Sequence, residues 1–89
     1  MEKDFFKELV DICRRAVKSD SDPVKCLGEI CILFKKTPIE ERIKSPKTGP
    51  EIDFYNEIVG YYQDTPYNLP PEKYRADISS FLNYLDKNN

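Results

Sequence analysis

Two carboxylates, those of Asp53 and Glu57, come closest in this chain to a catalytic arrangement of residue types and spacing. Side chains four positions apart lie on one face of a helix, and paired carboxyl groups are what acid–base chemistry such as glycoside hydrolysis requires. We predict that both lie on a solvent-facing stripe, with no cleft to enclose a substrate. The chain also lacks histidine, the commonest general base near neutral pH. An enzyme is therefore the least expected class.

The cysteines and glycines predict no metal, redox or phosphate site. Cys13, Cys26 and Cys31 include no CxxC spacing and fall on apolar or flanking helix positions, where cysteine behaves as a small hydrophobe. The three glycines are scattered, whereas phosphate-binding loops gather glycines ahead of a helix. We therefore expect no cofactor. The odd number of cysteines favours a reduced, cytoplasmic setting, and no apolar run reaches the roughly 18 residues that span a membrane.

Five of the six tyrosines lie in one stretch, from Gly49 to Tyr74. Tyrosine is frequent at protein interfaces because it offers a large area and a hydrogen bond at a small entropy cost. Helical spacing assigns three of the five mainly to the core, namely Tyr55, Tyr62 and Tyr74. Phe54, Tyr61 and Tyr67 are harder to bury in one small core, so we expect them at the surface.

Charge is divided unevenly along the chain. Residues 1–48 hold 11 Lys and Arg against 9 Asp and Glu, and residues 49–89 hold 3 against 7. An acidic, aromatic surface favours a basic partner and speeds its encounter. A basic run within residues 35–47 is a weaker candidate, because charge runs are usually solvated faces. The net charge of −2 gives no indication of direct nucleic-acid binding.

The elements that must position these residues are predicted to be helices. Apolar residues recur at steps of three and four over residues 4–18, 23–36, 51–63 and 70–85. Asp22 before Pro23 is a helix-start signal, and Thr48 with Glu51 fits a cap for the helix that follows. A second capping box, Thr37 to Glu40, predicts a short helix through Lys44. No segment alternates with period two, so we predict an all-α domain over residues 1–89, a small antiparallel bundle of four main helices plus one short helix.

The periodicity also predicts which side chains turn inward. Ile39 and Ile43 are expected to face the core from the short helix. In the 51–63 helix the expected inner face contains Ile52, Tyr55, Ile58, Val59 and Tyr62. Asp53, Glu57 and Asp64 share the opposite face, with Phe54 and Tyr61 on the border between the two.

Three segments, FFKELVDIC (5–13), SPKTGPEIDFYNE (45–57) and the proline-introduced closing helix (70–85), give the chain a resemblance to small helical bacterial immunity proteins. Proteins of this kind neutralise colicins or contact-dependent growth inhibition toxins. The resemblance is one of layout and implies a cytoplasmic four-helix domain whose carboxylates and adjacent tyrosines contact the toxin. Here the adjacent pair is Phe54-Tyr55, so Asp53, Phe54, Tyr55 and Glu57 would be the contacts.

Together these observations predict a protein-binding inhibitor, an immunity protein or antitoxin that covers the active or substrate-binding surface of a basic, nuclease-type toxin. The chain would act as a monomer or weak homodimer, away from membranes. The first alternative is a regulatory or adaptor domain in a larger protein or nucleic-acid assembly, possibly phage-encoded. A self-associating structural protein is the second. The predicted partner-binding residues are Asp53, Phe54, Tyr55, Glu57, Tyr61, Asp64 and Tyr67.

Overall fold

The computed structural model describes residues 4–88, so the predicted domain of 1–89 includes residues 1–3 and 89, which lie outside the described part. Five helices and no strand occur among the described residues, which confirms the all-α class. The helices are α1 (Phe5–Ala16), α2 (Pro23–Lys36), α3 (Ile39–Lys44), α4 (Gly49–Asp64) and α5 (Pro71–Asn88).

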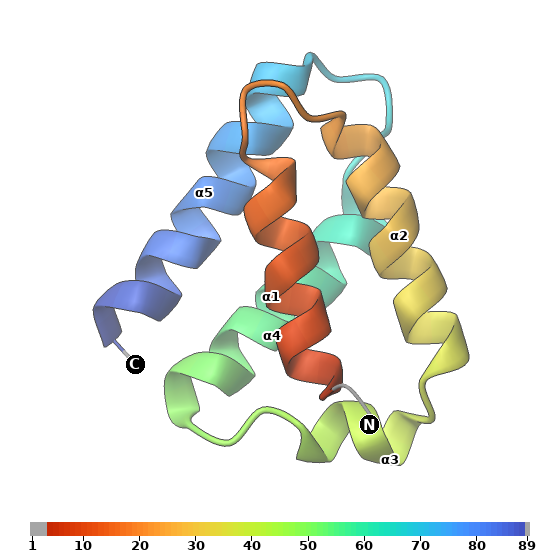
Figure 1. Ribbon diagram of the computed structural model, residues 1–89, viewed down its shortest axis with the longest axis vertical. Coiled ribbons are helices and arrows are strands. Elements are labelled where there is room, and N and C mark those ends of the chain that lie inside the picture. Colours follow the sequence, from red (N-terminus) through yellow and green to blue (C-terminus); the bar gives the residue numbers. More distant parts are fainter. Residues whose placement is uncertain (1–3, 89) are drawn as a thin grey trace.

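Helix α1 is the central element of the fold. It packs against α2 on one side and α5 on the other, while α4 packs against α5 and α2. Figure 1 shows α2 and α5 diverging from the top of the view, with α1 between them and α4 crossing behind α1. The more detailed expectation, an antiparallel bundle of four main helices, stays a prediction.

The caps predicted for α2 and α4 are present. The Asp22 carboxylate accepts hydrogen bonds from the backbone N–H groups of Val24 and Lys25, at 3.1 and 3.2 Å, and Pro23 begins α2. Thr48 and Glu51 form both halves of a capping box at the start of α4. These bonds satisfy N–H groups that have no partner within the helix, and they fix where each helix begins.

The capping box predicted at Thr37–Glu40 is wrong. The Thr37 hydroxyl donates instead to the Leu33 carbonyl oxygen, at 2.7 Å, and α3 begins after Pro38 without a side-chain cap. Thr37 stands at the end of α2, where carbonyl groups lack backbone donors, so its hydroxyl is used there.

The residue after α3 anchors the start of α1. The Ser45 hydroxyl accepts a hydrogen bond from the Phe6 backbone N–H, at 2.9 Å, and donates one to the Asp4 carboxylate. Ser45 is buried, so this contact between residues 39 positions apart holds α3 against α1.

The hydrophobic core draws on all helices except α3, which buries none of its own residues. Ile39 and Ile43, expected inside, are 60% and 63% exposed. In α4 the expected orientation is also wrong at two positions, because Ile52 is 45% exposed whereas Phe54 is 1% exposed. Phe54 packs edge-on against Phe6 of α1, with ring centroids 5.8 Å apart. The inner face of α4 is therefore rotated toward Phe54.

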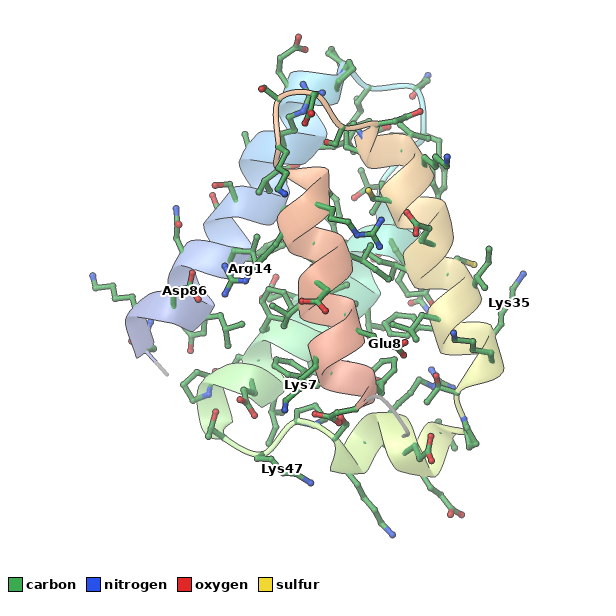
Figure 2. The ribbon with its side chains drawn as sticks, viewed as in Figure 1. Lys7, Glu8, Arg14, Lys35, Lys47 and Asp86 are labelled. Atoms are coloured by element: carbon green, nitrogen blue, oxygen red, sulfur yellow. The ribbon has the colours of Figure 1, made fainter. Side chains whose placement is uncertain are left out.

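Helix α5 continues past the predicted end at residue 85 and is helical through Asn88. Asp86 accepts two hydrogen bonds from the Arg14 guanidinium, at 2.7 and 3.1 Å (Figure 2), and this ion pair ties α5 to α1. The hydrogen bonds from Arg14 lower the pKa of the Asp86 carboxyl group below its usual value. Both groups are exposed, so solvent screens the pair and its contribution to stability is small.

The three cysteines are free thiols within or beside the core. Cys13 and Cys26 are buried and Cys31 is half-buried. Burial raises the pKa of the Cys13 thiol to about 12, which keeps it protonated near neutral pH. The prediction that they act as small hydrophobes fits this burial.

Candidate protein-binding groove

An open groove of about 480 Å³ lies between α4 and α5. We call it the α4–α5 groove, and its lining residues are Asp53, Phe54, Asn56, Glu57, Phe81 and Tyr84. Phe54 is buried and Phe81 half-buried, whereas Asp53 and Glu57 are exposed. The groove therefore combines recessed aromatic rings with two solvent-accessible carboxylates.

Helical spacing brings these residues together. Asp53 and Glu57 are one turn apart on α4, and Phe81 and Tyr84 are one turn apart on α5. The Tyr84 hydroxyl donates a hydrogen bond to Asp53 Oδ2, at 2.8 Å, and so links the two helices. The same bond raises the pKa of the Tyr84 hydroxyl, because ionised Tyr84 would face the Asp53 carboxylate.

A second link joins α4 to α5 farther along. The Tyr61 hydroxyl donates to Asp77 Oδ2, at 2.8 Å, and Lys73 pairs with the other oxygen of that carboxylate, at 3.0 Å. The Tyr61 ring meets Phe81 edge-on, with ring centroids 5.5 Å apart. Burial, followed by the bond to Asp77, raises the pKa of Tyr61 well above its ordinary value. Two tyrosine–aspartate bonds therefore hold the helices on either side of Phe81.

The predicted aromatic anchors are less exposed than expected. Phe54 is a core residue, so its assignment as a surface contact is wrong. Tyr61 is half-buried and its hydroxyl is engaged by Asp77. Tyr55 is also half-buried, and its ring packs against Phe5 and Phe34 with centroid distances of 5.9 Å in each case. Periodicity placed the rings of Phe54 and Tyr61 on the border between the inner and outer faces of α4. Neighbouring helices cover both rings.

Asp64 and Tyr67 are exposed, as predicted, but they do not line the α4–α5 groove. Asp64 ends α4, and Tyr67 lies in the following loop with half of its surface exposed. Tyr74 holds this loop in place, because its buried hydroxyl accepts from the Leu69 backbone N–H, at 3.0 Å, and donates to the Pro66 carbonyl oxygen. Tyr67 is thus presented from a loop fixed on both sides.

The structure adds Asn56, Phe81 and Tyr84 to the predicted site residues. Neither Phe81 nor Tyr84 is among the partner-binding residues predicted from the sequence. The available signal was their spacing of three positions, which places Tyr84 at the edge of the buried stripe of α5. Which α4 residues face that edge depends on how the two helices pack, and periodicity does not specify this.

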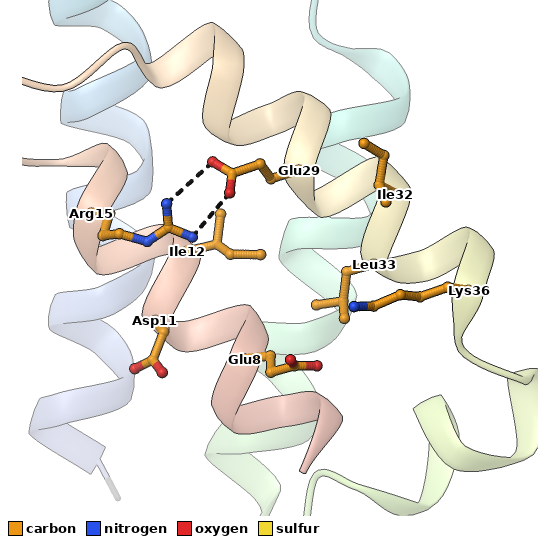
Figure 3. Close-up of a pocket in the computed structure, with 8 residues that line it drawn as sticks. All are labelled: Glu8, Asp11, Ile12, Arg15, Glu29, Ile32, Leu33 and Lys36. Carbon is orange, nitrogen blue, oxygen red and sulfur yellow. Dashed lines mark hydrogen bonds and ion pairs between the residues drawn. The ribbon is translucent and has the colours of Figure 1, made fainter. Parts of the chain in front are cut away.

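A second groove, of about 440 Å³, lies between α1 and α2. Arg15 and Glu29 form a two-pronged ion pair across it, with both bonds at 3.2 Å (Figure 3). Charges of both signs line the groove, from Glu8 to Lys36, so it has no uniform preference for a charged ligand.

Neither a metal centre nor a membrane span emerges from the described residues. Between residues 4 and 88, no group of three or more metal-ligating side chains is placed to hold an ion. Over the same range, no helix has the length and apolar character needed to cross a membrane. Comparison of the chain with protein-family models, curated proteins and solved structures finds no match. Function is therefore argued from the geometry of this chain.

Proposed function

We propose that this chain is a non-catalytic protein-binding inhibitor whose α4–α5 groove receives a basic, partly apolar segment of its partner. The observation that supports the proposal is the combination of the half-buried Phe81 ring with the exposed carboxylates of Asp53 and Glu57, in a groove held by the buried ring of Phe54. An apolar pocket with a charged rim is the usual anatomy of a protein interface.

The partner chemistry follows from this arrangement. A lysine or arginine side chain can lay its apolar stem against Phe81 while its charged head meets Asp53 or Glu57. The half of the chain that supplies the groove is acidic, with seven Asp and Glu against three Lys and Arg. This net charge would attract a cationic surface before contact.

The favoured partner is a nuclease-type toxin, and the chain would act as its immunity protein or antitoxin. Nucleases bind phosphate through cationic groups, so an acidic cover would block the surface that holds nucleic acid. The resemblance in layout to helical immunity proteins supports this choice. The proposed setting is the reducing cytoplasm of a bacterium, which accords with three free thiols, two of them buried.

Growth rescue tests this function. The gene beside this one is sequenced first. If it encodes a secreted protein with a C-terminal nuclease domain, that domain is the probe, expressed with the chain or without it. A neighbouring gene of another kind would favour the adaptor over the inhibitor. We expect the chain to restore growth and the double variant Asp53→Asn/Glu57→Gln to fail. The matched control is Glu40→Gln/Glu41→Gln, which makes the same change in net charge on α3. Equal rescue by both double variants would remove the groove from the interface.

One observation supports the alternative hypothesis, that the chain is an adaptor domain. Ile39 and Ile43 are exposed within the basic segment, residues 35–47, and exposed apolar residues often mark contact surfaces. Salt-dependent binding of DNA or RNA that is lost on replacing lysines in this segment would favour an adaptor over an inhibitor.

A further inference from the structure

Two isoleucines project from α3 without an apolar cover. Ile39 and Ile43 are four positions apart, so they lie on one face of this short helix, and they are 60% and 63% exposed. Leaving an isoleucine in water forgoes the favourable free energy of its burial. The pair therefore offers a small apolar knob.

Positive charge surrounds the knob. The basic segment holds five Lys and Arg against two Glu. Arg42 is used internally, since its guanidinium lies 5.6 Å from the centre of the Phe34 ring and donates to the Thr37 carbonyl oxygen. Lys35 and Lys47 extend outward from the ribbon in Figure 2, and Lys47 also donates to the Lys44 carbonyl oxygen, at 3.1 Å.

The same molecule carries a surface that complements this knob in two respects. The α4–α5 groove presents the rings of Phe81 and Tyr84, where the knob has isoleucines. It has the carboxylates of Asp53 and Glu57 at its rim, where the knob has lysines. Both the apolar contact and the charges would therefore be satisfied by docking one surface on the other.

We propose that α3 of one copy docks in the α4–α5 groove of a second copy, with Ile39 and Ile43 against the rings and Lys44 and Lys47 beside the carboxylates. Two isoleucines form a small contact, so the association is weak, strengthens at low salt and occurs at high protein concentration. Because self-association occupies the groove, it competes with any basic partner that uses the same surface. The inference does not depend on the proposed function, since copies could associate whether or not a toxin exists.

Sedimentation velocity of the full chain at increasing concentration, in low and high salt, tests the proposal. We expect concentration-dependent association that weakens as salt is added. Ile39→Ser/Ile43→Ser should weaken it at least about tenfold. The matched control is Ile32→Ser, because Ile32 is equally exposed, at 63%, but lines the α1–α2 groove (Figure 3). Ile32→Ser should associate like the parent chain.

Charge exchange then tests the pairing itself. Lys44→Glu/Lys47→Glu reverses the charge beside the isoleucine knob. Asp53→Lys/Glu57→Lys reverses the charge at the rim of the groove. Each variant alone should be monomeric, because its knob and groove repel. A mixture of the two should associate again, because an acidic knob then meets a basic groove. Circular dichroism of each variant establishes that it is folded.

Three results would overturn the proposal. One is a chain that stays monomeric at all concentrations. Another is association that the serine variants leave intact. The third is a mixture of folded charge variants that fails to associate. Failure of the parent chain to bind the toxin, with self-association intact, would count against the proposed function alone.

Discussion

The α4–α5 groove and the basic segment, residues 35–47, differ in how far their hydrophobic side chains are exposed to solvent. In the groove, aromatic rings are recessed and two tyrosine–aspartate bonds hold the flanking helices. On α3, the isoleucines stand outside the core and no side chain of the helix is buried. A surface held in place before binding loses less entropy on association. This difference supports the two proposals, that the groove receives a partner and that α3 of a second copy can enter it.

Phe54→Ala tests whether the α4–α5 groove is built on the core. Phe54→Ala should destabilise the fold by about 3–5 kcal/mol, because it empties a fully buried ring site beside Phe6. That loss is a large part of the total stability of a small domain, about 5–15 kcal/mol. Urea unfolding followed by circular dichroism measures it.

Ile52→Ala is the matched control, because Ile52 is exposed on the same helix. It should change stability by no more than about 0.5 kcal/mol. If the two costs were reversed, α4 would be rotated as its periodicity predicted, and Phe54 would again be a candidate surface contact.

Tyr61→Phe should remove a hydrogen bond to Asp77 and cost about 1 kcal/mol. The pKa of Tyr61 is raised above its ordinary value of 10.0, so the neutral hydroxyl stabilises the fold below pH 10 and this contribution is lost as the pH rises above it. The parent chain should therefore lose stability with rising pH in this range more steeply than the variant. Denaturant titrations from pH 8 to pH 11 compare them.

Tyr67→Phe provides the comparison for that measurement, since Tyr67 is half exposed in the α4–α5 loop. Its free energy of unfolding should stay within about 0.5 kcal/mol of that of the parent chain. An unchanged free energy for Tyr61→Phe as well would show that the second link between α4 and α5 contributes nothing.

The smallest effect on stability is expected on α3. Ile39→Ser/Ile43→Ser should alter the free energy of unfolding by no more than about 0.5 kcal/mol, because both side chains are already in water. Thermal unfolding at low protein concentration, where copies are separate, measures it. A loss of several kcal/mol would mean that the isoleucines pack inside, as the sequence pattern predicted.

The helices and two of the caps were predictable from sequence because their signals are local. Asp22 with Pro23 and Thr48 with Glu51 act within one turn of the residues they cap. The Thr37 signal was equally local, but Thr37 lies between two helices and has one hydroxyl. That hydroxyl bonds to the end of α2 and does not cap α3.

The candidate site was only partly predictable, for a different reason. Asp53 and Glu57 were identified from charge and spacing. The predicted burial of Phe54 and Ile52 was the reverse of the observed burial. Helix α4 carries apolar residues around much of its circumference, and its neighbours decide which of them are buried. The contribution of Tyr84 depends on a contact with Asp53 across 31 positions, which no local pattern contains.

The most direct test of the central claim, that the α4–α5 groove binds a basic partner, is a titration of the isotope-labelled chain followed by NMR. The probe is a short synthetic peptide with arginines on both sides of a leucine. We predict shifts in the amide signals of Asp53, Asn56, Glu57, Phe81 and Tyr84, and at least about tenfold weaker binding by Asp53→Asn/Glu57→Gln. Glu40→Gln/Glu41→Gln should bind like the parent chain. Shifts confined to the α1–α2 groove, or equal affinity of both double variants, would contradict the claim.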